Sequence, residues 1–363
     1  MKKQIIAMAV AAAAAACAQA GDVNVYGAMD TGLTYTHQKD TDSLAMTSGN
    51  YAGPRFGLKG AEDLGNGYKM KFILEAGFAD DTGAMGKQGS LFNRESQLAV
   101  ETPYGTVGFG RFGAFTSGSS SMSWYWDMEP FETGYNHAGT QATMNNIWTL
   151  HSNAMYYVSP TFAGAKFGIQ YGMSGDDDKE ADKWNDRSHW LNAAVRWDAE
   201  TVHVLAGVES MIFGDNKTAG EEDYDTFVNG KFAVSWDAMP DLRLYAGAAA
   251  YRNARTATTW GDTVAMDNPK TGRGLTGYAG NLGVRYTIGA ADLLAQVQYL
   301  SGKNKAPVAY AETDKFSRVV SSIGCHYHFS GRTMDYAVAS YTDDQKLLKD
   351  NVTYVHLGLT HFF

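Results

Sequence analysis

Apolar and polar side chains alternate in short runs along most of the chain. In one run, Phe167, Ile169 and Tyr171 alternate with Lys166 and Gln170. Alternation with a period of two predicts a β-strand with one apolar and one polar face. Further runs of this kind cover residues 23–35, 68–78, 202–209, 231–236, 242–248, 281–286 and 354–363. The chain is therefore expected to be built from strands.

The connections between these runs are of two kinds that take turns along the chain. Short turns occupy residues 64–67, 102–105, 160–164, 198–201, 237–241, 289–292 and 330–332. Long polar loops occupy residues 39–52, 80–90, 174–187, 214–225, 252–274, 302–315 and 342–351. This arrangement predicts an all-β fold, a transmembrane antiparallel β-barrel of about sixteen strands with short periplasmic turns and long extracellular loops. A soluble β-sandwich would not explain why the two kinds of connection alternate.

Composition fits many short strands joined by turns. The 363 residues include 40 Gly, 21 Tyr and 17 Phe but only 7 Pro. Aromatic residues gather near the ends of the predicted strands, as they do in the interfacial girdles of membrane barrels. The formal net charge of -9 argues against a nucleic-acid partner, which would need a basic surface.

The N-terminus has the pattern of a secretory signal peptide. Lys2 and Lys3 precede an apolar stretch at 5–16, and small residues at 18 and 20 predict cleavage after Ala20. Residues 1–20 are then the signal peptide and 21–363 the mature barrel. A short alanine-rich helix and a lipoprotein anchored at Cys17 are the alternatives. Cleavage leaves Cys325 as the single cysteine, so no disulfide within the chain is expected.

One long segment, at about 112–150, interrupts the alternation. A loop of this length in a compact fold is usually functional. It carries three neighbouring aromatic residues, Trp124, Tyr125 and Trp126, followed by the acids Asp127, Glu129 and Glu132.

Five features of the sequence resemble a known family. They are VYGAMDTG at 25–32, RFGLKGAEDLGNG at 55–67, Asn93-Arg94-Glu95 with GTVGFGR at 105–111, the position of the long segment, and the terminal Phe363. Together they are similar to the general porins of Gram-negative bacteria, especially the trimeric sixteen-stranded members. The resemblance implies a homotrimer in the cell outer membrane, in contact with lipid and lipopolysaccharide, through which ions and small hydrophilic solutes diffuse passively. It also implies that Phe363, with Leu357 and Leu359, is the signal read by the barrel-assembly machinery.

The resemblance further implies that the long third loop folds into the lumen and narrows it. Its acids, Asp127, Glu129 and Glu132, would then face a basic wall. The period of two independently puts Arg55, Lys59, Lys69 and Lys71 on the polar face of their strands. The family pattern adds Arg94. Arg111 lies at a strand-to-loop junction. The predicted basic wall is Arg55, Lys59, Lys69, Lys71, Arg94 and Arg111. Opposed charges across a narrow lumen would create a transverse field and bias ion selectivity, with a mild anion preference from the wall.

Two details of this region carry further expectations. The order Glu129-Pro130-Phe131-Glu132 departs from the Pro-Glu-Phe-Gly turn of many family members, which affects the expected shape of the loop. The strand that follows Arg94 is expected to place Glu95 and Gln97 on the outward face. Polar residues facing lipid would be costly, so they would favour a subunit interface at that position.

The sequence also bears on functions other than a diffusion pore. The aromatic run 124–126 could form a stacking platform in a solute-specific channel for a sugar or a dicarboxylate, or it could pin the loop to the wall. An outer-membrane barrel enzyme would need a nucleophile or acid–base set, and no such catalytic constellation is found. GFGRFG at 108–113 lacks the context of a nucleotide site, and His326 with His328 is too small a set for a structural metal site. No cofactor is expected.

Overall fold

The structure is a computed structural model that describes residues 23–118, 120–144, 150–173, 188–214, 225–254, 274–304, 315–346 and 350–363. The predicted signal peptide, residues 1–20, lies outside the described residues. Among the described residues, no helix is long and apolar enough to span a membrane.

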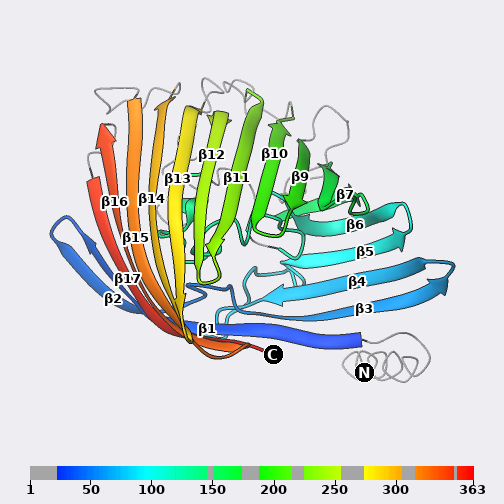
Figure 1. Cartoon of the computed structure of the whole chain (residues 1–363), viewed down its shortest axis with the longest axis horizontal. Coiled ribbons are helices and arrows are strands. Elements are labelled where there is room, and N and C mark those ends of the chain that lie inside the picture. Colours follow the sequence, from blue (N-terminus) through cyan, green and yellow to red (C-terminus); the bar gives the residue numbers. More distant parts are fainter. Residues whose placement is uncertain are drawn as a thin grey trace.

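Within the described residues, seventeen strands form one antiparallel sheet that closes on itself where β1 pairs with β17 (Figure 1). The strands are β1 Val23–Gln38, β2 Thr41–Ser48, β3 Arg55–Gly65, β4 Tyr68–Gly77, β5 Glu95–Thr102, β6 Gly105–Gly113, β7 Leu150–Val158, β8 Ala165–Gly172, β9 His189–Asp198, β10 Val202–Ile212, β11 Phe227–Met239, β12 Leu242–Ala254, β13 Leu275–Ile288, β14 Ala291–Asn304, β15 Lys315–Ser330, β16 Thr333–Lys346 and β17 Asp350–Phe362. A short 3-10 helix, η1, spans Thr140–Ala142.

The seventeen strands occupy sixteen positions around the barrel. Residues 31–38 of β1 pair with β2, whereas residues 23–28 of β1 pair with β3. β2 and β3 therefore share one position beside β1, and the prediction of an all-β barrel of about sixteen strands is confirmed.

Strand β2 lies inside the segment 39–52 that was predicted to be a loop, so that prediction was wrong. Lys39 adopts a left-handed φ of 54° and turns the chain back tightly on β1. The turn lets Thr41–Ser48 pair with residues 31–38 of β1. The predicted loop at 342–351 was also wrong, because the β16–β17 ladder continues to the pair Asp344–Asp350.

Side chains are sorted with apolar groups outside and polar groups inside, the reverse of a soluble protein. Leu282 and Ile323 face outward and are 63% and 65% exposed, while the inward-facing Gln298 is 1% exposed. This sorting follows from the period of two, because lipid solvates the outer face and the lumen holds the polar one.

The C-terminus closes the barrel. The backbone N–H of Phe363 donates to the carbonyl of Gly27 at 3.1 Å, and the N–H of Gly27 donates to the carbonyl of Phe363 at 3.0 Å. Leu357 and Leu359 face outward on β17 and are about half exposed. The last residue is therefore part of the sheet, next to the beginning of β1.

Candidate functional site

The described part of the connection from β6 to β7 lies within the barrel, against the inner surface of the strands. We call its described residues, 114–118 and 120–144, the inner loop. It begins at a dense polar anchor around Thr116. The Thr116 hydroxyl donates to Oε2 of Glu209 at 3.0 Å and accepts from Nδ2 of Asn192 at 2.9 Å. Nζ of Lys231 donates to the Thr116 carbonyl at 3.1 Å.

Two arginines of the opposite strands hold the middle of the inner loop. Arg196 on β9 binds both carboxylate oxygens of Asp127 at 2.6 and 2.7 Å and also donates to the Trp124 carbonyl at 2.8 Å. Arg285 on β13 pairs with Glu132 at 2.6 Å and donates to the Pro130 carbonyl at 2.8 Å. Bidentate and charge-assisted bonds of this kind fix orientation as well as position.

The end of the inner loop is held by side chains of β14 and β15. Nε2 of Gln298 donates to the carbonyls of Ala138 and Gly139 at 2.8 and 3.1 Å. Ser322 donates to the same Ala138 carbonyl at 3.0 Å. Arg318 donates to the Ala142 carbonyl at 3.3 Å. The loop is therefore bonded to the wall along its length, and we call β9–β15 the far wall.

Glu129 organises the inner loop from within. Its side chain is fully buried and accepts bonds from the backbone N–H of Thr133 at 2.8 Å and from the N–H and hydroxyl of Thr140 at 3.0 and 3.1 Å. Burial raises the pKa of Glu129 to about 7, although these hydrogen bonds act in the opposite direction. None of the three predicted loop acids is directed at the predicted basic wall: one is internal to the loop and two are paired with far-wall arginines.

The predicted basic wall divides into separate groups. Arg55 and Arg94 meet at one carboxylate, since Nε of Arg94 lies 2.6 Å from Oε1 of Glu75 and Nε of Arg55 lies 3.6 Å from Oε2. A Cβ added to Gly53 would lie 3.1 Å from the Arg94 guanidinium, so the glycine leaves room for it. We call β3–β5, with these residues, the near wall.

The three lysines lie on the same strand faces as Arg55 and Glu75, further toward the short turns. Lys59 is exposed and its Nζ lies 4.9 Å from the centre of the Tyr26 ring. Lys71 forms an ion pair with Glu101, and Lys69 is exposed.

Arg111 lies beside the near-wall cluster and bonds to other partners. Its Nε donates to the Asn93 carbonyl at 2.7 Å and its NH1 to the Ser152 hydroxyl at 2.8 Å. The neighbouring Phe112 is the residue that points inward, where it packs edge-on against Tyr156. A register shift between Gly110 and Phe112 accompanies this arrangement.

The expectation that Glu95 and Gln97 face outward was wrong. Glu95 is fully buried inside the barrel and accepts from the N–H and hydroxyl of Ser121 in the inner loop, both at 2.6 Å. Gln97 accepts from the Tyr156 hydroxyl at 3.0 Å. Their strand, β5, faces lipid with Leu98 instead, so these residues give no evidence for a subunit interface.

A cavity of about 440 Å³ separates the near wall from the inner loop. We call it the lumen cavity. The described residues that line it include the guanidinium groups of Arg55 and Arg94 but no carboxylate. The remaining lining comes from residues 48–54, 77–79 and 86, from Asn93 and Leu150, and from Gly118, Trp126, Thr133, Gly134, Asn136 and Gln141 of the inner loop.

The three predicted stacking residues have different surroundings. Trp124 stacks on Phe115 with ring centres 4.2 Å apart, and Tyr125 is buried. Trp126 alone of the three lines the lumen cavity, where its ring meets Tyr51 edge-on at 5.8 Å. The run therefore both pins the loop and offers one ring to the lumen.

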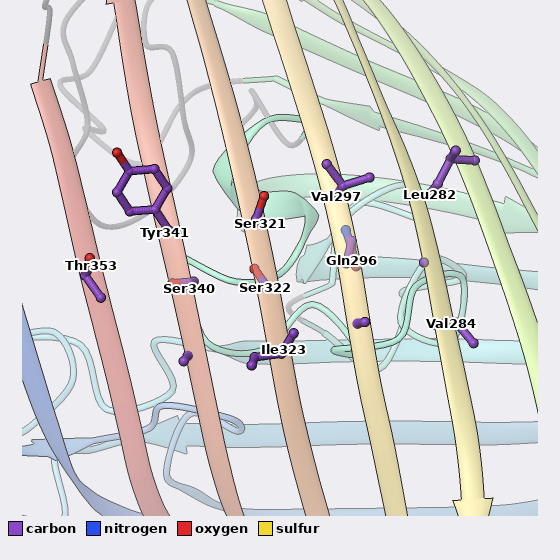
Figure 2. Close-up of a pocket in the computed structure, with 13 residues that line it drawn as sticks. Leu282, Val284, Gln296, Val297, Ser321, Ser322, Ile323, Ser340, Tyr341 and Thr353 are labelled. Atoms are coloured by element: carbon purple, nitrogen blue, oxygen red, sulfur yellow. The ribbon is translucent and has the colours of Figure 1, made fainter.

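Two hollows on the outer face are of a different kind. One, of about 670 Å³, crosses β13–β17 between outward-facing residues such as Leu282, Val297 and Tyr341 (Figure 2). The other, of about 920 Å³, crosses β8–β12. Both belong to the apolar outer surface and not to the lumen.

Sequence reasoning missed the far-wall residues that hold the loop. Arg285, Glu209 and Lys231 lie on the polar faces of predicted strands, so the period of two placed them in the lumen without indicating a partner. Their roles depend on which loop atoms reach them, and loop contacts have no periodic signal.

Comparisons with known proteins agree with this geometry. A family profile described as Gram-negative porin matches residues 6–347. An outer membrane porin protein of Bordetella pertussis is 28% identical over all of this chain and all of its own length. In structure, an anion-selective porin from Comamonas acidovorans is similar with a TM-score of 0.71 and 17% identity, over 94% of this chain and 100% of the other. OmpT of Vibrio cholerae in its trimer form has a TM-score of 0.60 and 16% identity, over 95% and 100% of the two chains.

A closed barrel with an apolar outer face, a polar lumen and a loop folded inside is the architecture of a channel rather than an enzyme. The family match covers most of the chain. This protein therefore belongs to the Gram-negative porins, which form passive diffusion channels in the outer membrane.

Proposed function

We propose that the lumen cavity is the constriction of the channel and that it favours small anions through Arg55 and Arg94. The observation that carries the proposal is the cavity lining, which has two guanidinium groups and no carboxylate among its described residues. Asp127 and Glu132 are paired with the far-wall arginines and Glu129 is buried within the loop, although Glu132 also accepts from the hydroxyl of Tyr51, which lines the cavity. A fixed positive charge in a narrow pore attracts anions and repels cations.

The anion preference is limited by Glu75, because its carboxylate pairs with both arginines and offsets part of their positive charge. The two guanidinium groups and the Glu75 carboxylate together carry a single positive charge, and the buried Glu95 places a further carboxyl group close to Arg55 and Glu75. The lysines at 59, 69 and 71 extend the positive surface toward the short turns, where Lys71 is partly balanced by Glu101. A modest anion preference is therefore expected. The anion-selective porin of similar fold agrees with this direction.

Reversal potential in a planar bilayer under a salt gradient tests the proposal. The reversal potential of wild-type channels should have the sign that is expected for a pore that prefers anions. Arg94→Glu should shift the reversal potential strongly toward cation preference, and Lys71→Glu should shift it less. Arg332→Glu, which changes an exposed turn residue by the same charge, is the control and should leave it nearly unchanged. Equal shifts for Arg94→Glu and Arg332→Glu would contradict the assignment.

We further propose that the chain is made as a precursor, cleaved after Ala20 and assembled as a homotrimer in contact with outer-membrane lipid and lipopolysaccharide. The trimer form of OmpT, which has the same fold, supports the trimer. Phe363, Leu357 and Leu359 would present the assembly signal to the barrel-assembly machinery. Conductance steps that arrive in threes would support the trimer, and single steps from a monodisperse monomer would contradict it.

A further inference from the structure

The lumen cavity is lined by two kinds of group, cationic side chains and aromatic rings. One side presents the guanidinium groups of Arg55 and Arg94, and other parts of the lining present the rings of Tyr51 and Trp126. Its volume of about 440 Å³ lies in the range of pockets that hold small organic molecules. The cavity can thus receive a molecule that is both anionic and apolar.

Trp126 differs from its neighbours in what its ring is used for. Trp124 is sandwiched between Phe115 and the Lys166 ammonium, which lies 4.8 Å from its ring centre. Tyr125 is 1% exposed and lies beneath Lys231. Trp126 remains partly exposed and lines the cavity. The first two rings serve only to hold the loop, whereas Trp126 packs against a buried cluster that includes Tyr51 and still presents part of its ring to the cavity.

Gln141 adds a polar feature that points to a ligand. Its side chain is 5% exposed and lines the same cavity. Its Nε2 donates to the Thr133 carbonyl, whereas its Oε1 has no hydrogen-bond partner among the described residues. A buried acceptor without a donor is costly, and this oxygen has almost no exposed surface, so a solute that brings an O–H or N–H into the cavity would satisfy it once the Gln141 side chain turns toward the solute.

We propose that the lumen cavity is a weak binding site for aromatic carboxylates, with the carboxylate at Arg94 and Arg55, the ring against Trp126 and a ring hydroxyl at Gln141. This inference rests on the proposed function, because it uses the same arginines. Guanidinium and carboxylate pair through parallel charge-assisted bonds, and aromatic rings pack edge-on or offset. A channel needs its solute to bind well enough to enter and weakly enough to leave, which an open, hydrated site provides.

Block of the chloride current by added carboxylates in single-channel recordings tests the site. The probes are acetate, cyclohexanecarboxylate, benzoate and 4-hydroxybenzoate. Benzoate should block the wild type at a concentration about threefold to tenfold lower than cyclohexanecarboxylate, which has similar size but no aromatic ring. 4-Hydroxybenzoate should block at a still lower concentration. Equal block by benzoate and cyclohexanecarboxylate would overturn the aromatic site.

Variants separate this inference from the proposed function. Trp126→Leu should abolish the advantage of benzoate over cyclohexanecarboxylate, while Trp126→Phe should keep most of the advantage. Gln141→Leu should remove only the advantage of the hydroxyl. If Arg94→Gln shifts the reversal potential but Trp126→Leu leaves the block by benzoate intact, the proposed aromatic binding site is contradicted and the proposed anion selectivity is supported. If Arg94→Gln shifts neither the reversal potential nor the block, the proposed function itself fails.

Discussion

Arginines lie on both walls of the lumen, but they have different partners on the two walls. On the far wall, Arg196 and Arg285 each bind one loop carboxylate and one loop carbonyl. On the near wall, Arg55 and Arg94 share Glu75 and line the open cavity. An arginine side chain holds the inner loop in place where the loop covers it, and it presents its charge to the lumen cavity where the loop leaves space. Under the proposed function, the position of the loop decides which arginines act on a solute.

The largest effect should follow from breaking a far-wall anchor. Arg285→Ala would leave the Glu132 carboxylate without its guanidinium partner, and both side chains are less than one-fifth exposed. Removing one member of a buried pair costs about 3–5 kcal/mol. The middle of the loop should detach, which single-channel recording would detect as higher conductance and larger current noise.

Arg285→Lys is the matched control for that anchor. It keeps the charge on the wall and should preserve most of the quiet conductance. Unchanged conductance and noise in Arg285→Ala would mean that the inner loop does not depend on this contact.

A smaller effect is expected at the start of the loop. Thr116→Val keeps the side-chain shape but removes the hydroxyl that lies between Glu209 and Asn192. The buried Glu209 then loses a donor, at a cost of about 1–3 kcal/mol. Thermal unfolding of the purified barrel should begin at lower temperature than for Thr116→Ser, which keeps the hydroxyl. Equal unfolding temperatures for the two variants would argue against this anchor.

Glu129 should give a pH-dependent effect on stability. Burial raises its pKa in the folded protein to about 7 from the ordinary value of 4.5, so folding favours its protonated form. This contribution, about 3 kcal/mol, is complete below pH 4.5 and is lost as pH rises to about 7. Glu129→Gln has no such titration. The unfolding temperature of the wild type should therefore fall relative to Glu129→Gln between these pH values, and a constant difference would contradict the buried acid.

The smallest effect is expected for charges toward the short turns. Lys69→Gln and Lys71→Gln remove exposed or partly exposed ammonium groups, one of which already pairs with Glu101. Solvent screens such charges, so each variant should change the reversal potential less than Arg94→Gln does. A larger shift from either lysine would move the constriction toward the short-turn end.

The sequence predicts the barrel better than it predicts the lumen, for a physical reason. Every strand must present apolar side chains to lipid, so alternation alone predicts that residues such as Leu282 and Ile323 face outward. The inner loop follows no such rule. Glu129 was expected to face the pore, but the backbone donors of Thr133 and Thr140 turn it into the loop.

Local deviations from the strand pattern also escaped prediction. Glu95 begins β5 directly after the irregular segment 78–94, so the phase of its alternation could not be set from the chain before it. β2 forms because one left-handed residue, Lys39, reverses the chain within a polar segment. Both errors arise where a single backbone conformation decides the outcome.

We propose that, among the arginines in the described part of the chain, those that line the lumen cavity set selectivity. The most direct measurement compares the reversal potential of Arg94→Gln with that of Arg111→Gln, a variant of equal charge change on an arginine held by Asn93 and Ser152. Arg94→Gln should move the reversal potential toward cation preference, and Arg111→Gln should stay close to the wild type. Equal shifts, or a larger shift for Arg111→Gln, would contradict the account.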